Sequence, residues 1–339
     1  MLRRVRGDSA VLEFVKRRVR GNHQDDAGDI APQEPEAPRP LIGLALGGGS
    51  ARGFAHIGVL RTLLANGITP DVITGTSIGA VVGGVYAAGR LDRFEDWARS
   101  LTRRRIFGYL DFNLAGSGLI GGARLADSLI GEVADIRIED LPLRFAAIAT
   151  EIGTGHEIWL THGRLAEALG ASYALPGIFP PALIGSRWLM DGALVNPVPV
   201  SAARALGARV VIAVNLNSDN FGRGTVIQNH GASGDEAMLE PEPKSAKRSD
   251  RSERLMRRQL LGTPGRPALS TVMVEAFNVM QDRITRARLA GDPPDVLIGP
   301  RTGNTGFFDF HRADETIQLG VEATEKALDA IRESVGALA

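Results

Sequence analysis

The pattern of apolar positions begins with an unbroken run, LIGLAL at residues 41–46, that has the length of a strand. Such a run, without alternation of apolar and polar positions, is typical of a strand buried on both faces of a parallel sheet. A glycine loop follows, and residues 51–67 then space their apolar side chains as a helix does. A second strand at residues 71–74 and a second helix at residues 77–88 continue the alternation. This order predicts an α/β protein with a mostly parallel sheet.

The remainder of the chain extends this pattern, with one interruption. From the apolar runs we expect strands at residues 145–150, 157–160, 187–190, 210–215 and 295–298. From helical spacing we expect helices at residues 164–171, 200–206, 270–289 and 312–338. Residues 217–267 break the pattern, because they are largely charged and polar and offer no apolar face to bury. Their composition predicts a disordered insertion inside a domain that otherwise spans residues 41–335.

The segment before this domain has a different character. Residues 1–20 carry seven basic and two acidic residues, with apolar side chains at helical spacing. A basic amphipathic helix of this kind lies on an anionic membrane surface or packs against its own domain, and the pattern leaves both open. Residues 21–40 are polar and rich in proline, which predicts a linker.

Composition and charge narrow the classes of protein. The chain has 39 basic and 39 acidic side chains, whereas a dedicated nucleic-acid binder is usually basic over a whole face, so we expect no nucleic-acid partner. It has no cysteine, which excludes thiol nucleophiles, disulfides and cysteine-bound zinc, and we expect no metal and no cofactor. No stretch reaches the ~20 apolar residues of a membrane span, and no secretion signal is recognised. We expect a cytoplasmic protein, with residues 1–20 as a peripheral contact to the inner face of the membrane.

A lone serine stands between two glycines where the second strand meets the second helix. The pentapeptide Gly75-Thr-Ser77-Ile-Gly79 in this setting predicts a nucleophile elbow, a sharp turn that presents the serine hydroxyl. The helix that begins there directs its first amides at the reacting centre. The alternative is that Ser77 only caps this helix.

The base that would activate Ser77 is less obvious. An α/β-hydrolase needs a histidine after its acid, which leaves His230, inside the expected insertion, and His311, near the start of the last helix. His56 lies within the first helix, where it is more typical of a packed side chain. Asp191 ends a predicted strand and is well placed to face a site, although an Asp-Gly pair alone is typical of a turn. A base other than histidine therefore stays open.

The loop GGGSARG provides the remaining chemistry. Successive amides between a strand and a helix form a nest for an anion, which in acyl transfer is the tetrahedral oxyanion. A nucleotide loop is the alternative, but the loop matches neither the Walker pattern nor Gly-x-Gly-x-x-Gly. The loop is therefore a candidate anion site, to which Arg52 adds a fixed positive charge.

Three motifs together, GGGSARGFAHIGVL, GTSIGA and DGA, resemble those of the patatin-like phospholipases, in particular the bacterial branch related to the neuropathy target esterase. Residues 294–320 are similar to that branch too, and the resemblance covers residues 41–216 and 270–335. It implies a three-layer fold, with a mostly parallel central sheet and helices on both faces. It also implies a Ser-Asp dyad, in which Ser77 is the nucleophile and Asp191 the general base.

The resemblance implies a serine acyl hydrolase that cleaves the carboxylic esters of phospholipids or lysophospholipids through an acyl-enzyme. It places the oxyanion hole at Gly48, Gly49 and Ser50, near Arg52, but many relatives have glycine where this chain has Ser50. A positive φ there would cost serine about 1 kcal/mol. Two alternatives remain: an α/β-hydrolase with a triad completed by His311, and a non-catalytic lipid- or partner-binding member of the fold.

Overall fold

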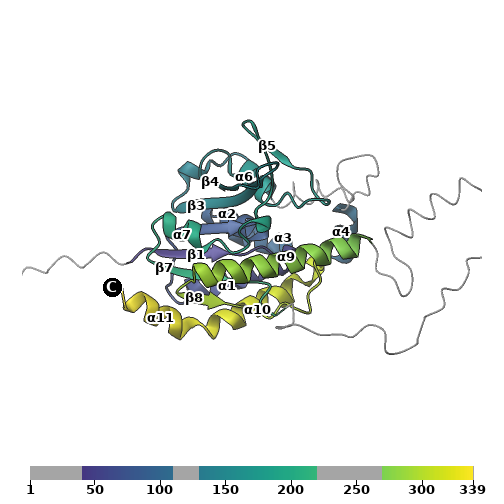
Figure 1. Ribbon diagram of the computed structural model, residues 1–339. Helices are drawn as coiled ribbons and strands as arrows, with labels where there is room; N and C mark the ends of the chain where they lie inside the picture. The colour runs from purple at the N-terminus through teal and green to yellow at the C-terminus, as the bar shows by residue number, and fades with distance from the viewer. Residues whose placement is uncertain (1–39, 110–129, 220–268, 339) are drawn as a thin grey trace, which may run out of the picture. The chain divides into compact units, whose positions relative to one another are not determined.

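The computed structural model describes residues 40–109, 130–219 and 269–338 (Figure 1). The basic segment 1–20, residues 21–39 of the linker, His230 and all but the first three residues of the expected insertion lie outside these ranges. Within them, eight strands form one sheet in the order β5-β6-β3-β2-β1-β7-β8, with β4 also paired to β3. The strands are β1 Ile42–Leu46, β2 Val72–Thr76, β3 Arg144–Glu151, β4 Glu157–Leu160, β5 Ala182–Ile184, β6 Arg187–Asp191, β7 Val210–Val214 and β8 Val296–Ile298.

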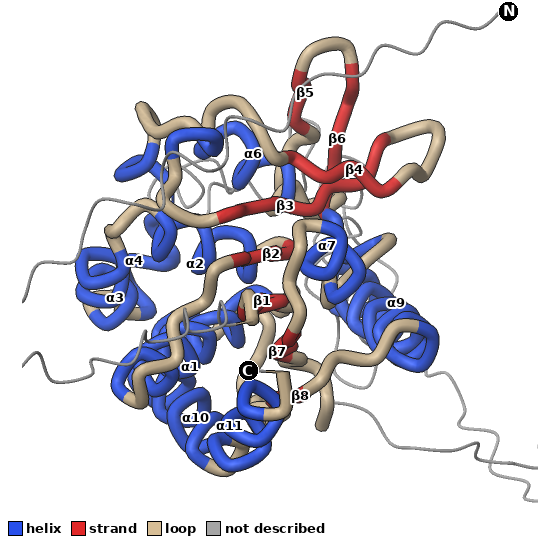
Figure 2. Tube along the Cα trace, turned by 90° about the vertical axis from the view of Figure 1, so that its left-hand side faces the viewer, coloured by secondary structure: helices blue, strands red, loops and turns tan. Residues whose placement is uncertain are grey.

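Helices cover both faces of this sheet. Figure 2 shows α7 and α9 on one side of the strands, and α1, α2 and α10 on the other. The helices are α1 Ala55–Ala65, α2 Ile78–Ala87, α3 Leu91–Arg99, α4 Arg103–Tyr109, α6 Leu165–Ser172, α7 Val200–Ala205, α9 Leu269–Gly291, α10 Ala313–Glu325 and α11 Leu328–Gly336. Short 3-10 turns lie at η1 Ser50–Phe54, η2 Gly131–Val133, η3 Ile138–Asp140, η4 Gly192–Leu194 and η5 Phe310–Arg312. The predicted three-layer arrangement is confirmed.

The central strands are buried on both faces, as the unbroken apolar run predicts. In β1, Leu44 and Leu46 belong to the large core beneath α1 and α2, whereas Ala45 belongs to a second core beside α7. β1, β2, β3, β7 and β8 run parallel, and β4, β5 and β6 are the antiparallel additions. Burial between two helical layers is characteristic of such parallel strands.

The register of the sheet places the predicted motifs at one edge. Leu46 of β1 pairs with Gly75 of β2, so the glycine loop and the Ser77 turn begin side by side. Thr76 pairs with Ile148 of β3, and the next residue of β3 pairs with Asp191 at the end of β6. Three segments far apart in the sequence therefore meet at the carboxyl ends of β1 and β2, where open α/β sheets bind ligands.

The sequence pattern missed several boundaries. The expected single helix at 312–338 is two, because α10 packs on α1 whereas α11 turns to contact β7 and β8. The break lies where the Ala327 amide donates to the Thr324 carbonyl, three residues back. The helices α3 and α4 and the three-residue strand β5 were not predicted. The expected start of the insertion at Asn217 is also too early, since Asn217 is buried and hydrogen-bonded to Arg52.

None of the helices in the described ranges combines the length and the apolar character needed to cross a membrane.

Candidate active site

Ser77 lies in a strained turn at the start of α2. Its backbone has φ 55° and ψ −126°, and its side chain makes no capping hydrogen bond to the helix. A non-glycine residue at positive φ costs on the order of 1–3 kcal/mol and is concentrated at functional sites. The two flanking glycines permit close approach, because a Cβ on Gly79 would lie 2.2 Å from the Leu46 carbonyl oxygen and one on Gly75 would lie 2.4 Å from the Ala80 Cα. The geometry is that of a nucleophile elbow.

Asp191 lies directly against this serine. The Ser77 hydroxyl donates to Asp191 Oδ2 at 2.6 Å, and the Ala193 amide donates to Asp191 Oδ1 at 2.8 Å. Burial raises the pKa of the Asp191 carboxyl to about 7, although the two hydrogen bonds oppose that rise. Gly192 lets the strand end so close to β3, since a Cβ there would lie 2.2 Å from the Ile148 carbonyl oxygen.

Ser172 holds the backbone of Ser77, and Thr150 holds the backbone of Asp191. Sequence analysis did not identify either residue. The Ser77 amide donates to Ser172 Oγ at 2.9 Å, and Ser172 in turn donates to the Ile148 carbonyl at 2.6 Å. Thr150 Oγ1 donates to the Asp191 carbonyl at 2.9 Å. These side chains approach the pair only through the fold, and neither lies in a motif that marks it in the sequence.

The glycine loop offers two amides to a bound anion. Four others in the loop are already used: Gly47 donates to Val214 O, Gly48 to Pro197 O, Ala51 to Phe307 O and Arg52 to Gly49 O. The amides of Gly49 and Ser50 have no acceptor among the described residues. The Gly48 amide is occupied, so of the three expected donor amides those of Gly49 and Ser50 are available.

Ser50 has the positive φ for which glycine, present at this position in many relatives, is better suited. Its φ is 52°, so serine here costs about 1 kcal/mol relative to glycine. Its side chain is hydrogen-bonded to Tyr173, whose pKa is raised by burial. Both residues line the same small cavity as Ser77.

Arg52 does not present its charge to Ser77 as expected. Its guanidinium donates from Nε to the Thr305 carbonyl at 3.0 Å and from Nη1 to Asn217 Oδ1 at 2.9 Å. Arg52 therefore ties the glycine loop to two later segments of the chain.

No histidine among the described residues hydrogen-bonds to Ser77 or Asp191. His56 is fully buried, and its Nε2 lies 2.8 Å from the Gly47 carbonyl oxygen. Burial lowers its pKa to about 4, so the ring is neutral at pH 7 and donates to that carbonyl. His311 instead lies against Arg103, with 3.1 Å between the Arg103 Nε and the His311 Nε2. The alternative of a triad completed by His311 has no support in this geometry.

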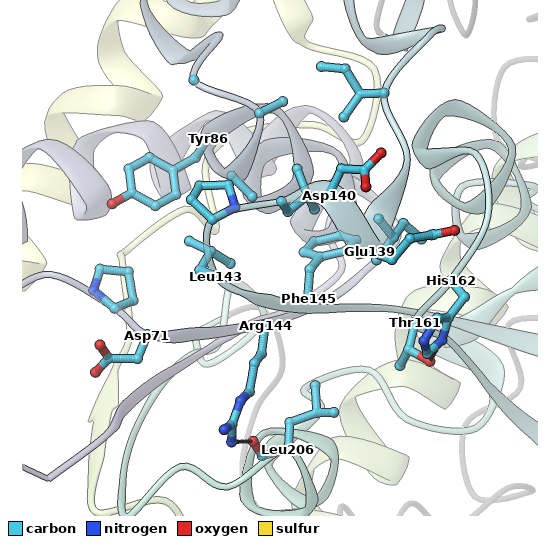
Figure 3. A pocket seen from close by; sticks show the side chains of 18 of the residues that line it. Asp71, Tyr86, Glu139, Asp140, Leu143, Arg144, Phe145, Thr161, His162 and Leu206 are labelled. Carbon is cyan, nitrogen blue, oxygen red and sulfur yellow. Dashed lines mark hydrogen bonds between the residues drawn. The ribbon is translucent and has the colours of Figure 1, made fainter.

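Three cavities differ in how close they lie to Ser77 and Asp191. A cavity of about 10 Å³ lies beside Ser77 and is walled mainly by aromatic and aliphatic side chains. An apolar cavity of about 270 Å³ adjoins it and shares three wall residues, Leu175, Ile178 and Phe308. The largest hollow, about 1100 Å³, lies at the opposite, amino-terminal end of the strands, beside Asp71 and Arg144 (Figure 3). Neither Ser77 nor Asp191 lines it.

The described residues contain no group of His, Asp or Glu side chains arranged to hold a metal ion. The site instead offers a buried carboxylate and neutral backbone amides.

Comparison with known proteins identifies the family of this chain. Residues 44–204 match the family model "Patatin-like phospholipase". An uncharacterized NTE family protein of Mycobacterium tuberculosis is 33% identical, over 86% of this chain and 92% of that protein. Patatin-like phospholipase domain-containing protein 7 of Rattus norvegicus is 38% identical over 52% of this chain but only 14% of that protein. Lysophospholipase NTE1 of Yarrowia lipolytica is 36% identical over 52% of this chain and 13% of that protein. The chain therefore belongs to the NTE family of patatin-like phospholipases, a family of lipid ester hydrolases.

Proposed function

We propose that this protein cleaves the carboxylic ester bonds of phospholipids or lysophospholipids through a Ser77–Asp191 dyad and a covalent acyl-enzyme. The observation that supports this most is the 2.6 Å hydrogen bond from the Ser77 hydroxyl to the buried carboxylate of Asp191. A serine hydroxyl is a weak nucleophile until a base in direct contact accepts its proton. A carboxylate whose pKa lies near 7 is matched to that task at neutral pH.

In the first half-reaction, Ser77 Oγ attacks the ester carbonyl carbon while Asp191 accepts the hydroxyl proton. The carbonyl oxygen becomes an oxyanion, which the Gly49 and Ser50 amides stabilise by hydrogen bonds. The amino end of α2 points its dipole at the same centre. Asp191 then returns its proton to the departing alcohol as the bond to the carbonyl carbon breaks, leaving Ser77 acylated.

In the second half-reaction, a water molecule takes the place of the alcohol. Asp191 accepts a proton from this water, whose oxygen attacks the acyl carbon of the ester on Ser77. The tetrahedral intermediate collapses, the fatty acid leaves, and the proton on Asp191 returns to Ser77 Oγ. These steps use only side chains and amides of the chain, so the proposed reaction needs no cofactor.

The two adjoining cavities indicate where a fatty-acyl chain is held. The larger cavity is lined by aliphatic, aromatic and methionine side chains from α9 and the segment after α6, together with Leu194 and Phe308. Its volume of about 270 Å³ is close to the lower end of the ~300–1,000 Å³ typical of small-molecule sites. The cavity beside Ser77 has room for about one water, so the shared wall of Leu175, Ile178 and Phe308 must turn aside as the chain enters.

The rest of the chain serves this reaction in the proposal. Residues 41–335 form the catalytic domain, interrupted by an insertion between β7 and α9. Residues 1–20 give peripheral contact with anionic lipid on the inner, cytoplasmic face of the membrane, because their basic charge favours such a surface.

The test is covalent labelling combined with lipid hydrolysis. A fluorophosphonate probe should label the wild-type protein and fail to label Ser77→Ala. Both Ser77→Ala and Asp191→Asn should lose at least 99% of ester hydrolysis, and the double variant should lose no more than either single one, because the two residues act as a unit. Retention of more than a tenth of the wild-type rate by Asp191→Asn would remove Asp191 as the base.

A further inference from the structure

Helix α9 buries a polar row where a helix usually buries apolar residues. Four polar side chains of α9 are almost completely buried, namely Asn278, Gln281, Asp282 and Thr285. The same helix leaves large apolar side chains exposed, among them Val272, Met273, Val279 and Met280. A buried polar group is costly unless it is hydrogen-bonded. Such an inverted helix therefore indicates that at least one residue of this polar row serves a purpose other than stability.

Donor and acceptor rules fix the orientation of one side chain in this row. Arg52 donates to Asn217 Oδ1 at 2.9 Å, and a guanidinium has only donors, so Asn217 must turn its oxygen toward Arg52. Asn217 Nδ2 then donates to Gln281 Oε1 at 3.2 Å. Gln281 consequently turns its own amide nitrogen away from Asn217.

The nitrogen of Gln281 points to the side of Gly48 on which the nucleophile lies. A Cβ added to Gly48 would lie 3.5 Å from the Ser77 Cβ, 3.5 Å from the Ala193 Cβ and 3.6 Å from Gln281 Nε2. The space left by this missing side chain is thus bordered by the nucleophile, by the turn that follows Asp191, and by Gln281. Gln281 Nε2 has no hydrogen-bond acceptor among the described residues, although the side chain is only 1% exposed.

We propose that Gln281 is a further catalytic residue, whose Nε2 donates a hydrogen bond to an oxygen of the tetrahedral intermediate formed on Ser77. Its contribution adds to those of the Gly49 and Ser50 amides, and the proposal rests on the function proposed above. Asn217 and Arg52 are positioning residues for Gln281. Through them the charge of Arg52 polarises a chain of amide groups that ends at the reacting centre, which strengthens the final donor.

The first experiment removes the donor and keeps the shape. Gln281→Met has nearly the same length and no N–H, and we expect its kcat for p-nitrophenyl butyrate to fall 10- to 100-fold. The KM should change less than threefold, because the interaction strengthens as charge develops in the transition state. Thr285→Val is the matched control, since Thr285 is also 1% exposed on α9 and its hydroxyl has no partner among the described residues. Its kcat should stay within twofold of wild type.

The second experiment reverses the donor through its neighbour. Asn217→Asp keeps an acceptor for Arg52 but offers oxygen to Gln281, which must then turn its Nε2 toward residue 217 and its Oε1 toward the substrate. We expect a similar loss of kcat, and a double variant with Gln281→Met no slower than Gln281→Met alone.

A folded Gln281→Met protein with kcat within twofold of wild type overturns the proposal. If circular dichroism shows that this variant does not fold, Asn217→Asp decides by the same twofold limit. Activity that survives Ser77→Ala would refute the proposed function instead, so the two failures are distinguishable.

Discussion

The chemistry of single residues depends here on burial more than on residue type. A free aspartate has a pKa near 4 and would be a poor base for a hydroxyl at neutral pH. Asp191 is 1% exposed, and burial raises its pKa to about 7. His56 is affected in the opposite direction, because burial penalises the charged form of either group. Asp191, and not His56, is therefore the group of the two that changes its charge near pH 7.

This shift predicts the pH dependence of the enzyme. In the proposed mechanism only ionised Asp191 accepts the Ser77 proton, so kcat/KM for a soluble ester should reach half its maximum near pH 7, level off above about pH 8 and fall below pH 7. The loss should approach tenfold for each further pH unit, as expected for one essential base. Initial rates measured from pH 5 to pH 9 give the profile. A thermal-unfolding scan at each pH shows that the protein stays folded. An acid limb centred below pH 5 would contradict a buried, raised carboxyl.

The sequence identified some of these residues and not others, for a physical reason. Ser77, Asp191 and the glycine loop each lie in a local motif, because neighbouring glycines in the sequence mark the tight turn or the strand end. Ser172, Asn217 and Gln281 lie in no such motif, and each meets its partner only after folding brings together segments many residues apart. Arg52 was found, but its partners were not, so its charge was assigned to the wrong contact.

At the scale of elements, local patterns predicted what local packing decides. The strand–turn–helix of β2 and α2 was placed within two residues, because two glycines around Ser77 and a buried apolar run mark its ends. The split between α10 and α11 was missed, since each helix is amphipathic toward a different partner and together they imitate one long helix. Strand β5 has three residues and draws its order from pairing with β6, which no short window reveals.

The side chains that α9 places in the apolar cavity should determine the chain-length preference of the enzyme. Its residues Met273, Ala276 and Met280 line the apolar cavity proposed for the acyl chain, and Ala276 is exposed, so a larger side chain fits there without strain in the core. Ala276→Phe should fill part of the cavity. We expect its kcat/KM for p-nitrophenyl dodecanoate to fall at least fivefold, and that for p-nitrophenyl butyrate to change less than twofold.

The control for this change is Val279→Phe, which makes the same kind of substitution at an exposed position on α9 outside the cavity lining. It should leave the ratio of the two rates unchanged. Equal loss on both esters in Ala276→Phe would show that the cavity does not hold the acyl chain.

At the scale of the whole molecule, the register of the sheet assembles the site. Parallel pairing aligns the ends of β1 and β2, and the antiparallel β6 then delivers Asp191 to the same edge from the other direction. The predicted fold class followed from the alternation of strands and helices, but the alternation does not give strand order. The direct contact between Ser77 and Asp191 is a consequence of that order.

The last prediction concerns how this site reaches an aggregated lipid. Residues 1–20 carry seven basic and two acidic side chains, a net charge of +5. At roughly 1 kcal/mol per basic residue near an anionic surface, this charge supports reversible peripheral binding. Removal of residues 1–20 should therefore lower binding to phosphatidylserine-containing vesicles at least tenfold at low salt, in a sedimentation assay. Hydrolysis of p-nitrophenyl butyrate should be unchanged, and the wild-type binding should weaken as salt rises, because exposed charges are screened over ~8–10 Å. Equal vesicle binding by the truncated and full-length proteins would refute a membrane role for this segment. A parallel loss of soluble-ester activity would show instead that it packs against the catalytic domain.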